Sequence, residues 1–206
     1  MLEYYTIAMI ALLAAISPGP DFVIVVRNAL AHHRSSAIYT SFGITAGVLV
    51  HTTYCMLGLA IIISGSLFLF ISIKYLGAAY LIYLGVKSLR SQADNGAALA
   101  KKIVPTEMTN GKAFRDGFLT NVLNPKCTLF ILSVFTVVVK PHTPLLVQCI
   151  YALEIALIGL TWFVFLSFAL THQSVKDRMV NVQHIVTKVI GVVLLGLGVS
   201  IIVSFR

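Results

Sequence analysis

The chain has 206 residues, of which 58% are hydrophobic and 11% charged, with a formal net charge of +8 at pH 7. One soluble core of this length cannot bury so much apolar surface, so a soluble globular protein is excluded and the surplus must face lipid. The basic residues lie between apolar runs, which indicates membrane topology and argues against a nucleic-acid partner.

Six apolar runs follow one another, and each is long enough to cross a bilayer core, which takes about 20 helical residues. We predict spans at residues 4–26, 37–63, 67–89, 114–139, 145–170 and 185–205. The polar segment between the third and fourth runs is expected to be a linker between two halves of three spans each. The predicted fold is an all-α integral membrane protein with one transmembrane domain, made of repeat one (1–89), a cytoplasmic linker (90–113) and repeat two (114–206).

Most of the 15 Lys and Arg residues fall in the first, third and fifth connections, whereas Lys140 and Arg206 fall on the other side. By the positive-inside rule the odd-numbered connections are cytoplasmic and both termini are outside. No small-residue cleavage site follows the first apolar run, so we expect a retained first helix and no removable signal peptide.

The first span is interrupted by the sequence Ser17, Pro18, Gly19, Pro20 and Asp21. Two prolines around a glycine remove backbone donors and break a helix, and a carboxylate inside a membrane needs a partner or water. Two interpretations stay open. The segment lines a cavity, or it is a proline kink that lets Asp21 reach the cytoplasmic interface.

The second and third spans carry small residues at helical spacing. Gly43 and Gly47 lie on one face with His51, and we expect the glycines to serve helix packing. His51, near the middle of its span, could relay protons or hydrogen-bond a neighbouring helix. In the third span Gly77 and Gly85 are likewise expected at helix contacts. Tyr80 and Tyr83 of the same span are expected to be packing or interface aromatics rather than ligands.

The fourth span carries a matching break at Asn121, Asn124, Pro125 and Lys126. Asn124 is predicted to be an N-cap, with Pro125 at the first helical position. A cation in the first turn of a half-helix opposes the helix dipole, so Lys126 needs an anionic partner. That partner could be Asp21, in a structural ion pair, or a bound solute.

The fifth span places Glu154 about nine residues into the membrane, with no partner evident from the sequence. Cys55, Cys127 and Cys149 lie in apolar spans without a CxxC pattern and are expected to pack as small hydrophobes. The histidines have no metal-ligand spacing, so we expect no metal site and no cofactor.

The two halves repeat each other. Their breaks fall in corresponding spans, and Lys74 and Lys188 each precede a glycine by three residues, the second of these being Gly191. Three spans per half is an odd number, so the second half must be inverted relative to the first. Inverted repeats with paired broken helices are typical of alternating-access transporters.

Four motifs carry a family resemblance: residues 17–21, the Gly-Ile-Thr-Ala-Gly sequence at 43–47, residues 77–81 with Gly85, and residues 118–121 followed by Asn-Pro-Lys at 124–126. In these motifs, its length and its basic linker, the chain resembles the LysE/RhtB family of bacterial amino-acid exporters. It looks most like the homoserine and threonine branch.

The resemblance implies a multi-pass exporter in the bacterial cytoplasmic membrane, with protons and an amino acid such as threonine, homoserine, lysine or leucine as partners. A channel, a structural membrane partner and an exporter of another small metabolite are the alternatives. An intramembrane enzyme is not favoured, because the sequence shows no nucleophile and base at a recognisable motif. Glycine faces could pack within the protomer or between protomers, so a homodimer stays possible.

Our mechanistic hypothesis places a solute ammonium near Asp21 and its carboxylate near Asn124, Pro125 and Lys126. The candidate binding residues are Ser17, Pro18, Gly19, Pro20, Asp21, Asn121, Asn124, Pro125 and Lys126. Asp21, Glu154 and His51 are the candidate proton carriers.

Overall fold

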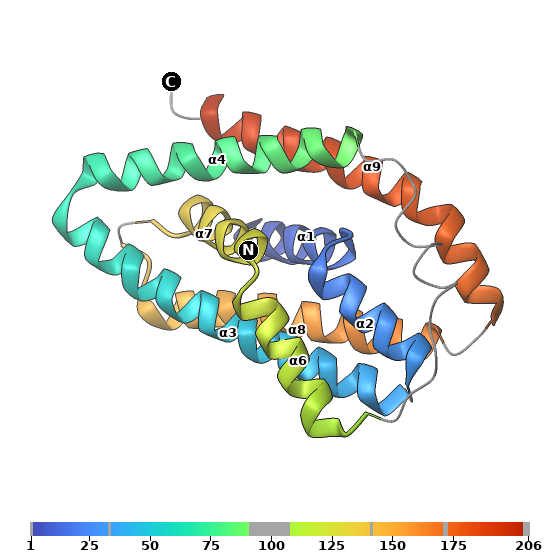
Figure 1. Ribbon diagram of the computed structural model, residues 1–206. Coiled ribbons are helices and arrows are strands. Elements are labelled where there is room, and N and C mark those ends of the chain that lie inside the picture. Colours follow the sequence, from blue (N-terminus) through green and yellow to red (C-terminus); the bar gives the residue numbers. More distant parts are fainter. Residues whose placement is uncertain (1, 33, 91–107, 141, 171–172, 204–206) are drawn as a thin grey trace.

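The computed structural model describes residues 2–32, 34–90, 108–140, 142–170 and 173–203. Within these ranges all regular structure is α-helical, which confirms the predicted all-α class (Figure 1). The helices are α1 (Leu2–Ile16), α2 (Pro20–Ala31), α3 (Arg34–Gly65), α4 (Leu67–Arg90), α6 (Asn110–Val122), α7 (Pro125–Val138), α8 (Leu145–Ala169) and α9 (Gln173–Val203).

The six predicted spans correspond in chain order to α1 with α2, α3, α4, α6 with α7, α8, and α9. By length and composition, two described helical stretches can each cross a bilayer, Arg34–Leu59 and Leu145–Ala169. The pairs α1/α2 and α6/α7 are bent by 56° and 61° and would each pass the same test as one broken span. The predicted helix breaks in the first and fourth spans are therefore confirmed.

Several helices extend beyond the predicted spans. Helix α2 ends at Ala31 rather than 26. Helix α6 begins at Asn110 rather than 114, and its N-cap Thr109 accepts a hydrogen bond from the Lys112 amide (3.4 Å). Helix α9 begins at Gln173 rather than 185. Hydropathy marks the apolar part of a helix, whereas its hydrogen bonds continue into polar turns that lie outside lipid. Residues 91–107 of the predicted linker lie outside the described part of the chain.

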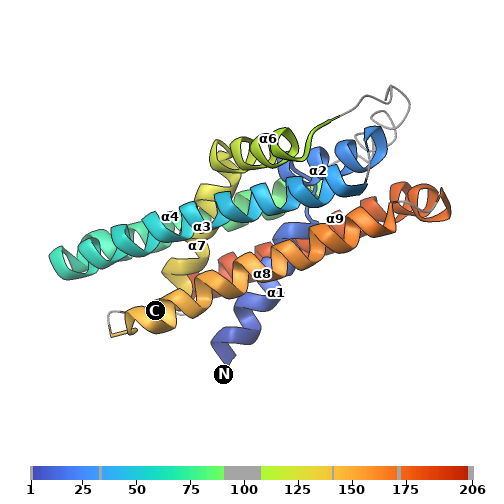
Figure 2. The same cartoon turned by 90° about the horizontal axis from the view of Figure 1, so that it is seen from below.

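The helices form two outer pairs around a central pair. Helices α4 and α9 lie side by side, α3 packs against α8 on the opposite edge, and α1 and α7 lie between these pairs (Figure 1). Helix α6 lies along α3, turned away from the direction of α7 (Figure 2).

Two apolar clusters hold this arrangement together. The first joins α1, α3, α4, α7, α8 and α9 through residues such as Ile10, Leu81 and Phe135. The second joins α2, α3 and α8 through residues such as Phe22 and Ile44. Because α1 contributes to the first cluster and α2 to the second, the break between them lies where the two clusters meet.

Close helix contacts depend on glycine. A Cβ atom on Gly43 would overlap the Phe114 carbonyl oxygen of α6, and one on Gly117 would overlap the Thr40 carbonyl oxygen of α3. The five glycines expected at helix contacts all lie where an added Cβ would come within 3.0 Å of another helix: Gly43, Gly47, Gly77, Gly85 and Gly191. Gly117 was missed because it lies among polar residues.

We predict that Gly43→Ala destabilises the protein by about 1–3 kcal/mol, because the new methyl group must push α6 away from α3. Gly58→Ala is the matched control in the same helix, since an added Cβ there meets no atom within 4 Å. Thermal unfolding in detergent checks this, with a lower midpoint expected for Gly43→Ala only. Equal midpoints for the two variants would show that the α3–α6 contact tolerates a side chain.

Candidate functional site

The two helix breaks meet near the centre of the molecule. Gly19 has an extended backbone (φ −174°, ψ −178°) and leads into Pro20 at the start of α2. Asn124 caps α7, because its Oδ1 accepts a hydrogen bond from the Lys126 amide at 3.0 Å, and Pro125 opens the helix. The predicted cap and proline position are confirmed. Both α2 and α7 thus begin at this point, with the positive ends of their dipoles toward it.

The Asp21 carboxylate is bound by amides from the other half of the chain. Its Oδ2 accepts hydrogen bonds from Asn121 Nδ2 (2.9 Å) and Asn124 Nδ2 (3.4 Å). Its Oδ1 is buried and has no hydrogen-bond partner within the described residues. Half of the carboxylate is therefore fixed, while the other half can still take a proton, water or another donor.

Lys126 makes the reciprocal contact. Its Nζ donates to Ser17 Oγ (3.1 Å) and to the Pro18 carbonyl oxygen (3.2 Å), both in the break between α1 and α2. The expected alternative of a direct ion pair with Asp21 is wrong, since these two described residues form no salt bridge. The ammonium lies instead just beyond the C-terminus of α1, where the negative end of that helix dipole favours a cation.

His51 joins the site from α3. Its side chain is 1% exposed, and its Nε2 lies 2.9 Å from the Asn121 carbonyl oxygen, to which it donates. Its Nδ1 lies against the Tyr54 hydroxyl and 3.3 Å from Thr128 Oγ1. The ring thus hydrogen-bonds the neighbouring broken helix, as one of the two interpretations of His51 expected. Tyr54 and Thr128 were missed, since neither stands out among the residues of an apolar span.

Glu154 lies apart from this network. It belongs to α8 and lines neither of the two cavities that adjoin the breaks. Its Oε2 is buried and has no hydrogen-bond partner in the described ranges.

A cavity of about 770 Å³ lies on one side of the breaks. Ser17, Gly19, Asn124 and Lys126 form its polar end. From there it extends along α2 and α4, where the lining residues include Tyr80, Tyr83, Lys87 and Ser88. Such a volume falls within the range of small-molecule sites, which is about 300–1,000 Å³.

The aromatic and basic wall of this larger cavity was not predicted from the sequence. Tyr80 and Tyr83 were expected to be packing or interface residues, yet both line the cavity. The Lys87 Nζ lies 5.7 Å from the centroid of the Tyr83 ring, within reach of a cation–π contact. A lysine near a helix end looks like an ordinary topology signal, which is why Lys87 gave no functional indication.

A smaller cavity of about 80 Å³ lies on the other side of the breaks, with room for a few water molecules. Asp21, Asn121 and Cys127 line it together with apolar residues of α1, α3 and α8. Lys126 lines both cavities, whereas Asp21 lines only the smaller one. A solute in the larger cavity would therefore contact Lys126 directly. Asp21 would lie on the far side of the joint, which is the place where the two helix breaks meet. No group of three or more His, Cys, Asp or Glu side chains in the described ranges is placed to hold a metal ion.

Comparison with known proteins gives a consistent result. The family model of the LysE type translocators matches residues 12–204. The chain is 33% identical to the uncharacterized membrane protein YrhP of Bacillus subtilis (strain 168), with 93% of this chain and 94% of that protein covered. It is 30% identical to a threonine efflux protein of Salmonella typhimurium, with 99% of both chains covered. It is 28% identical to a homoserine/homoserine lactone efflux protein of the same organism, with 70% of this chain and 68% of that protein covered. No solved structure matches significantly.

Proposed function

Because the chain belongs to the LysE type translocators, a family of amino-acid efflux transporters and not of enzymes, we propose that it exports small amino acids of the threonine or homoserine type in exchange for protons. The main support is the joint between the two broken helices, where Asp21 and Lys126 each bind the opposite half beside a cavity of about 770 Å³. Paired half-helix N-termini of this kind bind substrate carboxylates in other carriers.

In this proposal the amino acid lies in the larger cavity. Its carboxylate faces Lys126 and the start of α7, where a cation and a helix N-terminus both favour negative charge. Its ammonium faces the ring of Tyr80, since aromatic faces attract cations and the Tyr83 ring already has the Lys87 ammonium near it. Ser17 also lines this cavity, and its hydroxyl hydrogen-bonds a small polar side chain of the bound amino acid.

Proton coupling is assigned to Asp21. One of its oxygens is held by Asn121 and Asn124, and the other is buried without a partner. A proton on that free oxygen would remove a negative charge from the joint and so change the attraction between the two halves of the chain. His51 would support this step by holding the Asn121 backbone in place.

The proposal includes six spans arranged as two inverted repeats. Its support is that α1/α2 and α6/α7 are bent to similar extents, and that the contacting pairs α3/α8 and α4/α9 consist of elements with corresponding places in the two halves. The larger cavity extends toward Lys87 and thus toward the basic connections. By the positive-inside rule this side is cytoplasmic, so the conformation would be inward-facing with both termini outside.

Reconstitution into liposomes tests the function. We expect saturable counterflow of radiolabelled threonine or homoserine, accelerated when an inward proton gradient is imposed and not when an ionophore collapses that gradient. Absence of flux for a full panel of amino acids would contradict the proposal, and non-saturable flux would indicate a channel instead.

A further inference from the structure

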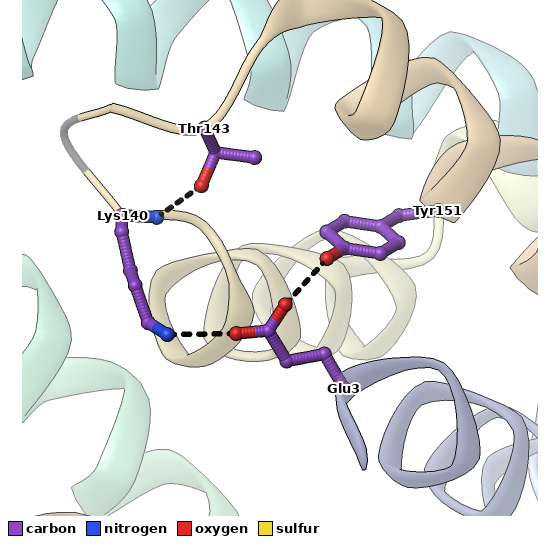
Figure 3. Close-up of polar contacts among 4 residues, drawn as sticks. All are labelled: Glu3, Lys140, Thr143 and Tyr151. Atoms are coloured by element: carbon purple, nitrogen blue, oxygen red, sulfur yellow. Dashed lines mark hydrogen bonds and ion pairs between the residues drawn. The ribbon is translucent and has the colours of Figure 1, made fainter. Parts of the chain in front are cut away.

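A second polar network lies at the ends of α1 and α7 that are remote from the breaks (Figure 3). Lys140, two residues beyond α7, donates from Nζ to Glu3 Oε1 at 2.7 Å. Tyr151 of α8 donates from its hydroxyl to Glu3 Oε2 at 2.9 Å. One carboxylate in the first turn of α1 therefore ties that helix to the end of α7 and to α8.

The partners of Glu3 are held in position by further contacts. Tyr151 is 1% exposed, and its ring packs edge-on against Tyr4 with 5.2 Å between centroids. The Lys140 backbone amide donates to Thr143 Oγ1 at 2.9 Å (Figure 3). The Tyr151 hydroxyl is thus a donor held in place beside Glu3, and the Lys140 backbone is anchored close by.

Between this network and the breaks the molecule is filled with apolar side chains. Ile7 and Ile10 of α1 pack in one cluster with Val134 and Val138 of α7, and all four are at most 3% exposed. The described lining of the two cavities extends along α1 only as far as Ala11. The cavities are therefore closed on the side of the Glu3 network.

We propose that Glu3, Lys140 and Tyr151 form the outer gate of the carrier, and that their separation lets α1 move from α7 and α8 so that solute leaves on that side. The proposal rests on the proposed transport function and on the positive-inside orientation. The side chains of Lys140 and Glu3 are 70% and 40% exposed. A pair this accessible to water is weak and can break in every cycle, whereas separating a buried ion pair would be costly.

Labelling of Cys127 from outside tests the gate, because this thiol lies at the joint in the smaller cavity. In a Cys55→Ala and Cys149→Ser background, intact cells are treated with a membrane-impermeant maleimide. We expect Glu3→Gln and Lys140→Gln to raise the labelling rate about five-fold or more. Lys140→Gln removes one charge-assisted hydrogen bond from the closed state, and Glu3→Gln removes the charge from two.

Three further variants make the test specific. The double exchange Glu3→Lys with Lys140→Glu should return the labelling rate toward that of the parent. Tyr151→Phe, which keeps the ring packed against Tyr4, should give a smaller increase and serves if the charge variants do not fold. Asp116→Asn is the control, because it breaks the Arg115–Asp116 ion pair of α6, which lies away from Glu3, and should leave labelling unchanged.

Unchanged labelling in folded Glu3→Gln, Lys140→Gln and Tyr151→Phe proteins would overturn the gate. So would faster labelling that is seen only when the same reagent is applied to inside-out membrane vesicles, in which the cytoplasmic face is exposed. The assay measures access and needs no transported solute. If the variants changed labelling but the parent transported no amino acid, only the proposed function would be contradicted. If the parent transported amino acids but the variants left labelling unchanged, only the gate would be contradicted.

Discussion

Replacing Asp21 with asparagine is expected to abolish the acceleration of export by a pH gradient while leaving counterflow of solute in place. The asparagine oxygen can still accept hydrogen bonds from Asn121 and Asn124, so the joint should keep its geometry. The amide cannot gain or lose a proton, however, and the buried position of Oδ1 becomes permanently neutral. Counterflow needs only the loaded carrier to reorient, so it does not require this titration.

The gradient effect should fall by about ten-fold or more, because coupling between two sites typically changes equilibria by 5–150-fold. The measurement is initial flux in liposomes with and without an imposed pH difference. Glu154→Gln is the informative comparison, since Glu154 is a carboxylate within α8 that lines neither cavity. If Glu154→Gln lost the gradient effect and Asp21→Asn kept it, the assignment of the proton site would be wrong.

Replacing Lys126 with glutamine should weaken solute binding strongly. Lys126 lines both cavities, and it is the charged residue of the larger one that lies beside the helix breaks, whereas Lys87 lies further along α4. Hydrogen bonds to charged groups contribute about 1.5–3 kcal/mol, so the KM for an amino acid should rise about 10- to 100-fold.

Loss of Lys126 also removes its hydrogen bonds to Ser17 and Pro18, so the measurement must separate binding from folding. Counterflow over a range of solute concentrations gives KM. The midpoint of thermal unfolding of the same preparation shows whether loss of these hydrogen bonds has destabilised the protein. Lys112→Gln is the matched control, because that lysine is exposed on α6 and lines neither cavity. An unchanged KM in folded Lys126→Gln would exclude Lys126 as the carboxylate partner.

The local features of the site could be predicted from the sequence. Proline and glycine at residues 18–20, and asparagine followed by proline at 124–125, act on the backbone of their own segment and so mark the breaks directly. The unusual charges Asp21 and Lys126 were recognisable because each is costly inside a membrane.

What could not be predicted depends on contacts between distant segments. Asp21 and Lys126 seemed suited to pair with each other, yet each binds neutral groups of the opposite break, a choice set by how the half-helices cross. Nothing in the sequence links Glu3 with Lys140, and only the fold brings their side chains, far apart in the chain, to 2.7 Å. Helical periodicity carries no information on either pairing.

The most direct test of the account is one series of liposome measurements on the parent, Asp21→Asn and Lys126→Gln proteins, in which threonine counterflow is followed at equal pH and then under a pH gradient. The account predicts counterflow for the parent and Asp21→Asn, little for Lys126→Gln at the same threonine concentration, and acceleration by the gradient for the parent alone. If Asp21→Asn instead lost counterflow together with its gradient response, solute binding and proton coupling would not be divided between Lys126 and Asp21, and the account would be contradicted.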